Sequence, residues 1–148
     1  MATYTQILYQ VIFSTKYRTP SLSKQNRARL FRYLHGTLRN RQCNCYEING
    51  IEDHIHLLFY LHPSMSLATL VKEIKGARTY IIKKENLFEK FNGWQIGYGA
   101  FTYSQSAKQN LINYILNQEE HHKKENFIDE YKRLLKKHNI PFDPKLLE

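Results

Sequence analysis

The hydrophobic pattern of this chain switches between a period of two residues and a period of three to four. Strands are expected where β-branched and aromatic residues alternate loosely with polar ones, because successive side chains of a strand point to opposite faces. Helices are expected where apolar residues recur at intervals of three and four. By these rules the sequence predicts strands at residues 4–14, 43–49, 53–61 and 94–102.

Helices are predicted between and after these strands. Ser106 and Gln109 have the spacing of a capping box, and serines also precede the first two helices. The order β-α-β-β-α-β followed by helices predicts an α+β fold, the ferredoxin-like split β-α-β. Its antiparallel sheet would carry helices on one face and an added C-terminal helix that bears Tyr114. The predicted helices cover residues 23–40, residue 66 to at least 81, residues 106–118 and residues 127–138.

Size and charge narrow the kind of protein. A chain of 148 residues, 42% of them hydrophobic, predicts a single domain over residues 1–148 with an ordinary core. The net charge of +9 favours an acidic partner, nucleic acid first, although a merely basic protein is the alternative. No apolar run approaches the roughly 18 residues that span a membrane, and the polar N-terminus is not a signal peptide. We therefore expect a cytoplasmic protein without membrane attachment.

The most informative segment is the third predicted strand, which contains His54-Ile55-His56. Alternation places both imidazoles on one face and turns Ile55 to the other face, toward a core. Neutral imidazole is the commonest metal ligand in proteins, so the pair can hold one metal ion. A His-x-His pair on a strand also arises by chance, and a metal site needs further support.

A second motif lies sixty residues further along, where Tyr114 and Gln118 stand four apart on a predicted helix. Residues at this spacing share one helix face. A phenol and an amide on one face, near two histidines, would provide a nucleophile and a third metal ligand. Taken alone, the motif favours the alternative, in which Tyr114 is one of eleven tyrosines and packs at a helix edge.

Together, the two histidines and the Tyr114-x-x-x-Gln118 motif resemble the small single-tyrosine HUH transposases of bacterial insertion sequences. Relatives of that family include the REP-associated tyrosine transposases. The resemblance covers most of the chain and is least diagnostic from residue 127 onward. It also includes a first strand that runs into a Lys-Tyr-Arg turn, the basic helix after the histidines and the strand before the tyrosine helix, at residues 9–18, 70–76 and 94–101.

The resemblance implies a DNA strand-transfer reaction. Tyr114 would cut single-stranded DNA through a 5′-phosphotyrosine link, which a 3′-hydroxyl later resolves without a nucleotide cofactor. His54, His56 and Gln118 would bind a divalent metal, either Mn²⁺, which imidazole favours, or the more abundant Mg²⁺. The family acts as homodimers on hairpins at the ends of mobile elements, so the expected partners are single-stranded DNA hairpins and a second subunit. Whether Tyr114 serves its own or the partner's histidines stays open.

Basic side chains gather on the predicted helices and after the first strand. We expect Lys72, Lys75 and Arg78 to contact DNA, because they form one polar stripe on the helix that follows the histidine strand. Lys16 and Arg18 close the first strand and are further candidates for phosphate binding. Interleaved tyrosines are available to stack on unpaired bases. The alternative is that these charges lie on solvated helix faces.

The two cysteines, Cys43 and Cys45, receive a structural interpretation. Their C-x-C spacing lacks the further cysteines of a zinc ribbon or a disulfide framework. We expect incidental or structural thiols, because a free cysteine behaves as a small hydrophobic residue. A metal site with His35 or His62 is the alternative.

The doubled His121-His122 is expected on the surface. Neighbours on a helix diverge by about 100°, so the two rings do not easily share an ion. His122 lies one turn beyond Gln118, and the alternative is that it lines the site. Asp53 and Glu52 form either a charged turn or carboxylate support for the metal ligands.

Three alternative functions remain open from the sequence. A relaxase or replication-initiator nickase would share the tyrosine chemistry. A catalytically silent module that binds single-stranded DNA or RNA hairpins would share the sheet. A metal-dependent phosphodiesterase would use water in place of the tyrosine. A covalent protein–DNA adduct separates the tyrosine enzymes from the other two.

Overall fold

A four-stranded antiparallel sheet forms the centre of the fold. The structure, a computed structural model, describes residues 1–147 apart from the side chains of residues 77 and 78. The sheet order is β2-β3-β1-β4, so that β1 and β3 are central. The strands are β1 (Leu8–Ser14), β2 (Cys45–Gly50), β3 (His54–Tyr60) and β4 (Gly99–Tyr103).

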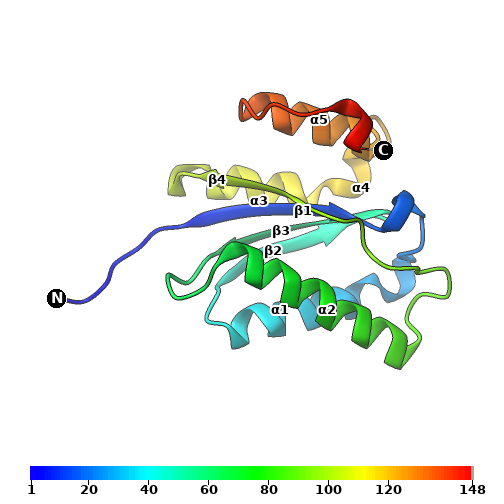
Figure 1. Cartoon of the computed structure of the whole chain (residues 1–148), viewed down its shortest axis with the longest axis horizontal. Helices are drawn as coiled ribbons and strands as arrows, with labels where there is room; N and C mark the ends of the chain where they lie inside the picture. Colours follow the sequence, from blue (N-terminus) through cyan, green and yellow to red (C-terminus); the bar gives the residue numbers. More distant parts are fainter. Residues whose placement is uncertain (148) are drawn as a thin grey trace.

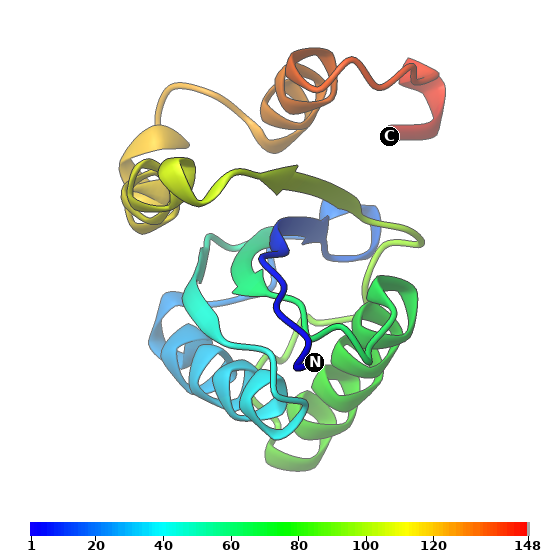
Figure 2. The same ribbon diagram turned by 90° about the vertical axis from the view of Figure 1, so that its left-hand side faces the viewer.

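Helices cover both faces of this sheet. In Figure 1 two long helices lie below the sheet and the C-terminal helices lie above it, and Figure 2 shows the same layers from the side. The predicted α+β fold, with its split β-α-β order and its added tyrosine-bearing helix, is confirmed. None of the described helices combines the length and apolar character needed to cross a membrane. The helices are α1 (Lys24–Asn40) and α2 (Leu67–Glu85) below, then α3 (Lys108–Leu116), α4 (Gln118–His121) and α5 (Phe127–Lys137), with short 3₁₀ turns η1 (Lys16–Arg18), η2 (Gln105–Ala107) and η3 (Pro144–Leu147).

Alternation along the central strands builds a separate core on each face. One set of side chains, including Phe13 and Ile55, packs with α1 and α2. The alternate set, including Ile12 and Leu58, packs with the C-terminal helices. The first core contains Val11, Phe13, Ile55, Leu57 and Phe59 with Leu30, Leu34, Leu70 and Ile74, and the second face contacts Leu111, Ile115, Phe127, Tyr131 and Leu134.

The first and fourth strands begin several residues later than predicted. Residues 1–6 are exposed and lie outside the sheet, so the first strand starts at Leu8. Trp94 forms only an isolated bridge with Thr15, and the fourth strand starts at Gly99. Gly97, with φ of +87°, takes the chain out of the extended conformation between them.

The helix that carries Tyr114 also has different ends from those predicted. It starts at Lys108, and the predicted cap at Ser106 is wrong because its hydroxyl lies 2.7 Å from the hydroxyl of Ser104 instead. It ends at Leu116, and Asn117 separates it from α4. Tyr114 and Gln118 therefore lie on successive helices and not on one.

Gly50 ends β2 where the chain turns toward β3, and a larger residue does not fit there. A Cβ atom would lie 2.2 Å from the backbone oxygen of His54 and 2.9 Å from the Cα atom of Ile55. We expect Gly50→Ala to lower the free energy of unfolding by roughly 1–3 kcal/mol, as overpacking does. Urea unfolding measures the change.

Gly36→Ala is the matched control for this substitution. A Cβ atom at Gly36, in the middle of α1, meets nothing within 4 Å. Helix propensity predicts a gain of roughly 0.5–1 kcal/mol there. Equal effects of the two substitutions would contradict the steric explanation for Gly50.

Candidate active site

His54 and His56 lie on the central strand β3, and neither has any exposed surface. Their rings point toward α5, where they contact Phe127 and Glu130. Ile55 between them packs into the core on the opposite face. The ring centroids are 5.2 Å apart, so the two imidazoles lie side by side on one face.

A buried carboxylate of α5, Glu130, lies at the centre of the site. Its Oε1 atom lies 3.1 Å from His56 Nε2, 3.0 Å from His122 Nε2 and 3.4 Å from His54 Nε2. Its Oε2 atom accepts a hydrogen bond from the Tyr114 hydroxyl. One carboxylate therefore joins the histidines to the tyrosine.

Hydrogen bonds at the outer nitrogens orient the two histidine rings. His54 Nδ1 lies 2.7 Å from Asp53 Oδ1, and His56 Nδ1 lies 3.1 Å from Gln10 Nε2. Both rings consequently turn Nε2 toward Glu130. Partners of this kind fix the orientation of histidines in metal sites. Asp53 therefore helps to orient the His54 ring, as expected of a carboxylate that supports a metal ligand.

Tyr114 and Gln118 both reach the histidines although Asn117 interrupts the helix between them. Gln118 is fully buried, with Oε1 at 3.2 Å from His54 Nε2 and its own Nε2 at 3.3 Å from the Glu130 carboxylate. Tyr114 is half-buried, and its ring centroid lies 6.0 Å from that of His56. The structure therefore brings the tyrosine and the amide to the same place.

Arg133 of α5 contacts the Tyr114 hydroxyl from the other side. Its Nη2 atom donates to Tyr114 Oη at 2.8 Å and to Glu125 Oε1 at 3.1 Å. The guanidinium carbon lies 5.8 Å from the centroid of the tyrosine ring. A phosphate that approaches Tyr114 would meet this cation, and a guanidinium is well shaped to bind phosphate oxygens.

The surface position expected for His122 is wrong. Only 3% of its side chain is exposed, because α5 packs back toward the sheet and encloses it. Its Nε2 atom contacts Glu130, and its Nδ1 atom is buried without a hydrogen-bond partner among the described residues. His121 is half-buried, with Nε2 at 2.7 Å from Glu125 Oε1.

Burial and hydrogen bonding move the pKa values of the site in different directions. Burial would lower the pKa of His54, but the Asp53 and Glu130 carboxylates outweigh it and raise that pKa to about 9. Burial lowers the pKa of His56 to about 4, and Glu130 offsets only part of this. Burial and the Glu130 carboxylate raise the pKa of the Tyr114 hydroxyl. Burial would also raise the pKa of Glu130, but its histidine partners hold that pKa well below its usual range.

The raised pKa of His54 predicts a pH-dependent stability in metal-free protein. A proton bound more tightly in the folded state stabilises the fold fully below the unfolded pKa near 6.5, and this contribution disappears as the pH rises through about 9. With EDTA present, raising the pH from about 6.5 to about 9 should lower the free energy of unfolding of wild type by on the order of 3 kcal/mol more than that of His54→Gln. Urea unfolding of both proteins at each pH measures this, and parallel pH curves would contradict it.

The side chains around Glu130 fit a divalent metal ion. His54, His56, His122 and Glu130 each offer one ligand atom, and these atoms lie within 4.8 Å of one another. The Gln118 amide oxygen is a further donor beside His54. Imidazole with carboxylate and amide oxygen is a donor set that suits divalent ions such as Mn²⁺. This donor set contains the carboxylate of Glu130, which was not among the predicted metal ligands.

Lys16 and Arg18 lie at the end of β1, next to the histidine strand. Ser14, two residues before Lys16, pairs with His54 in the sheet. Lys16 is exposed, and Arg18 lines a surface cavity together with Asp53, which contacts His54. The structure therefore places these two basic residues at the border of the site.

Helix α2, whose sequence carries the basic stripe, covers the sheet face opposite the histidines (Figure 1). Lys72 is exposed. Lys75 Nζ donates to the carbonyls of Gln95 and Gly97 at 2.9 and 2.5 Å, and burial lowers the pKa of Lys75 to about 8. The side chain of Arg78 lies outside the described residues. A role of this stripe in DNA binding stays a prediction.

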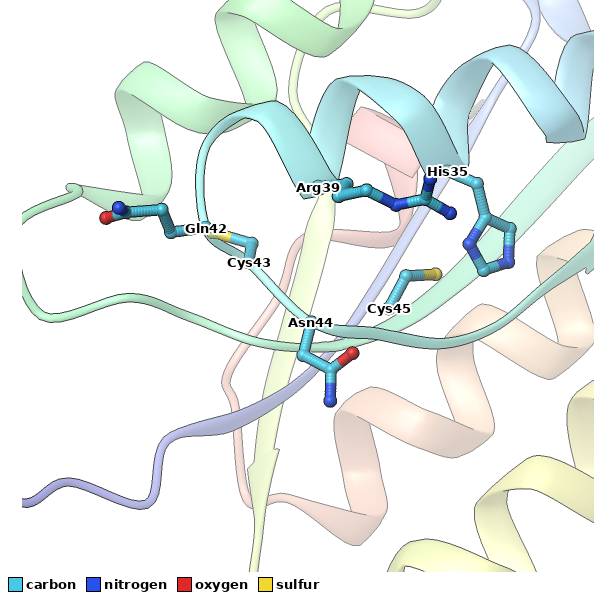
Figure 3. Close-up of a pocket in the computed structure, with 6 residues that line it drawn as sticks. All are labelled: His35, Arg39, Gln42, Cys43, Asn44 and Cys45. Carbon is cyan, nitrogen blue, oxygen red and sulfur yellow. The ribbon is translucent and has the colours of Figure 1, made fainter.

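Cys43 and Cys45 lie beside α1 and border a cavity of about 360 Å³. In Figure 3 the Cys45 sulfur points toward the ring of His35, whereas the Cys43 sulfur points away from it. Burial raises the pKa of the Cys45 thiol to about 12, which disfavours the thiolate that binds metals. Among the described residues, neither cysteine belongs to a group of three close metal-ligating side chains.

Glu130 and Arg133 were not among the predicted site residues, and His122 was placed in the site only as the alternative to a surface position. All three residues lie beyond the Tyr114-x-x-x-Gln118 motif. A pattern in α5 could have revealed Glu130. Glu130 occupies the apolar stripe of that helix, three residues after Phe127 and four before Leu134, and both of these are buried. A charged residue on a buried stripe requires a partner, which indicates a polar site beneath the helix.

Comparison with known families supports the assignment that the motifs suggested. The profile of the family described as Transposase IS200 like matches residues 3–118. The match covers most of the chain and ends at Gln118, before His122 and Glu130. None of the curated proteins matches this chain.

Among the solved structures that resemble this fold are two that are described as transposases. A protein of Deinococcus radiodurans R1 described as a transposase has a TM-score of 0.61 and 22% identity over 80% of this chain and 95% of its own. The REP-associated tyrosine transposase bound to a REP hairpin has a TM-score of 0.57 and 14% identity over 79% of this chain and 72% of its own. These likenesses concern the fold alone. The family match over residues 3–118 leads to one conclusion: the chain belongs to the IS200-like transposase family.

Proposed function

We propose that this protein is a transposase that cuts and rejoins single-stranded DNA, with Tyr114 as its nucleophile and residues 1–148 acting as one domain. The observation that carries the proposal is the hydrogen bond from the Tyr114 hydroxyl to Glu130, the same carboxylate that His54 and His56 contact. This geometry supports the proposal because the Tyr114 hydroxyl lies beside a group of side chains that fits a divalent ion.

The proposed reaction exchanges one phosphodiester bond for another. Tyr114 Oη attacks the scissile phosphorus in line, so that the Oη–P bond forms while the P–O3′ bond breaks. The products are a 5′-phosphotyrosine and a free 3′-hydroxyl, whose oxygen takes a proton from water. A 3′-hydroxyl of another strand later reverses the exchange without a nucleotide cofactor, because the phosphotyrosine conserves the energy of the cut bond.

Glu130 orients the phenol, since its Oε2 atom accepts the hydrogen bond from Tyr114, and the phenolic proton leaves to water because the histidine partners hold the pKa of Glu130 well below its usual range. The raised pKa of Tyr114 means that few molecules hold a phenolate before DNA arrives. Reactivity must therefore come mainly from the position of the hydroxyl and from the surrounding positive charge. Arg133, at 2.8 Å from Tyr114 Oη, supplies part of that charge.

The proposed cofactor is Mg²⁺ or Mn²⁺, held by His54, His56 and Gln118, with Glu130 and His122 as additional donors. A bound ion would neutralise charge on the oxygens of the scissile phosphate and increase the electrophilicity of phosphorus. Asp53 and Gln10 hold the outer nitrogens of the two histidines and so preserve their orientation.

We propose hairpin-bearing single-stranded DNA as the partner. The net charge of +9 and the position of Lys16 and Arg18 at the border of the site support an anionic ligand. The REP-associated transposase of similar fold was solved bound to a REP hairpin, which supports a hairpin as the partner of this protein too.

We also propose that the protein acts as a homodimer. Tyr114 lies beside the histidines of its own chain, which is compatible with cleavage within each subunit.

The test is a covalent adduct with a defined polarity. A pool of hairpins with randomised single-stranded flanks carries different fluorophores on its 5′ and 3′ ends, and is incubated with the protein and Mn²⁺. On a denaturing gel, the 3′ label should move with the protein and the 5′ label should leave it. Cutting without an adduct would support the water-dependent phosphodiesterase. Binding without any cutting would support the silent module.

A further inference from the structure

A cavity of about 450 Å³ opens beside the proposed nucleophile, between α3, α5 and the strands β1 and β4. Tyr114 forms part of its wall, together with Leu111 and Leu134. The volume lies in the range of sites that enclose small molecules. The apolar side chains offer a surface on which a flat ring can pack.

The charge of the cavity favours an anion. Arg133 and Lys137 line it, and no described lining residue is a carboxylate. Arg133 Nη2 lies 2.8 Å from Tyr114 Oη, so this cation stands where an attacked phosphate must come. Lys137 Nζ lies 5.8 Å from the ring centroid of Tyr103. Positive charge therefore extends from Tyr114 along the cavity.

Tyr103 gives the cavity a fixed aromatic wall. Its hydroxyl donates to Gln10 Oε1 at 2.9 Å and lies 3.0 Å from His138 Nε2, and these contacts hold the ring in place. Asn110 is exposed and also lines the cavity, where its amide offers both a donor and an acceptor. Aromatic and apolar side chains beside cations are the combination that binds a base with its phosphate.

We propose that this cavity binds the nucleotide on the 3′ side of the cut, which keeps the scissile phosphate. The proposal rests on Tyr114 as the nucleophile. In-line attack puts the departing 3′-oxygen on the side of phosphorus opposite Tyr114 Oη, away from the cavity. The nucleotide that keeps the phosphate stays joined to Tyr114, so its base packs against Tyr103 while its phosphate meets Arg133.

The first test measures nucleotide binding in the absence of metal and of cleavage. Thymidine 5′-monophosphate and the other three deoxynucleoside 5′-monophosphates are titrated in EDTA, up to about 10 mM, and followed by NMR. We expect saturable shifts of resonances from the lining residues. Asn110→Trp, which fills the cavity from an exposed position, should weaken binding by about tenfold or more.

Gln109→Trp is the matched control, because Gln109 is the exposed neighbour that does not line the cavity. This variant should bind like wild type, and circular dichroism should show both variants folded. No saturable binding by wild type, or equal binding by both variants, would overturn the proposal.

A second test uses a DNA that forms the covalent adduct. Removal of the base 3′ of the cut should slow single-turnover adduct formation by roughly tenfold, in line with the loss of one stacked base. Removal of the base 5′ of the cut should have a much smaller effect. A larger effect from removing the base 5′ of the cut would overturn this proposal, and Tyr114 would still be the nucleophile because the adduct forms. Nucleotide binding at the cavity without an adduct on any DNA would instead refute Tyr114 as the nucleophile.

Discussion

Tyr114→Phe is expected to eliminate the protein–DNA adduct while DNA binding is retained. The substitution removes one oxygen and preserves the ring, whose centroid lies 6.0 Å from that of His56 and 5.3 Å from that of His121. Loss of a nucleophile with the rest of the site intact should lower the rate by roughly 10³-fold or more. Adduct formation on a denaturing gel measures cleavage, and fluorescence anisotropy with labelled hairpin DNA measures binding.

Tyr98→Phe provides the matched control for this experiment. Tyr98 is half-buried and close in sequence, and its ring lies 5.9 Å from Lys75 Nζ on the other face of the sheet. The Tyr98 variant should form the adduct at the wild-type rate. An adduct formed by Tyr114→Phe would assign the nucleophile to another tyrosine, whereas loss of binding together with cleavage would indicate a structural defect.

The double variant His54→Ala/His56→Ala is expected to lose Mn²⁺ binding and metal-dependent cleavage together. It removes two of the imidazoles around Glu130, and loss of even a supporting partner in a metal site costs 10- to 100-fold in affinity, so we expect a loss of roughly 100-fold or more. Calorimetric titration with Mn²⁺ measures affinity directly. Gln118→Ala should weaken binding less, because both imidazoles remain.

His62→Ala controls for the loss of a histidine elsewhere. His62 lies in the loop after β3, where its Nδ1 atom contacts the Ser64 hydroxyl at 2.6 Å. This variant should retain Mn²⁺ affinity and cleavage. EDTA should stop cleavage by wild type and leave hairpin binding largely intact. Unchanged Mn²⁺ affinity in the double histidine variant would remove these residues from the metal site.

The fold and the histidine pair could be predicted because both follow from local rules. The alternation of β3 is a property of any extended backbone, so the common face of His54 and His56, and the opposite direction of Ile55, needed no knowledge of the tertiary structure. The order of strands and helices likewise restricts the sheet to few topologies. The start of β4 could not be placed as well, because Gly97 interrupts an otherwise strand-like segment.

Glu130 could not be located in the same way, and His122 could be placed in the site only as an alternative. The turn after α4 decides where they lie, and its path depends on how α5 packs against the sheet and not on a motif of its own. The break at Asn117 has a similar cause, since no glycine or proline marks it. Tyr114 and Gln118 were predicted to share a face of one helix, but they lie on successive helices, and both reach the site through contact with Glu130.

His54 and His56 have no exposed surface, whereas Tyr114 is half-buried and borders an open cavity. DNA can therefore dock beside the tyrosine before any phosphate oxygen reaches the Nε2 atoms of the histidines. We therefore expect the contact with Tyr114 to form first, so that substitution of the two histidines changes cleavage and leaves the association rate of DNA unchanged.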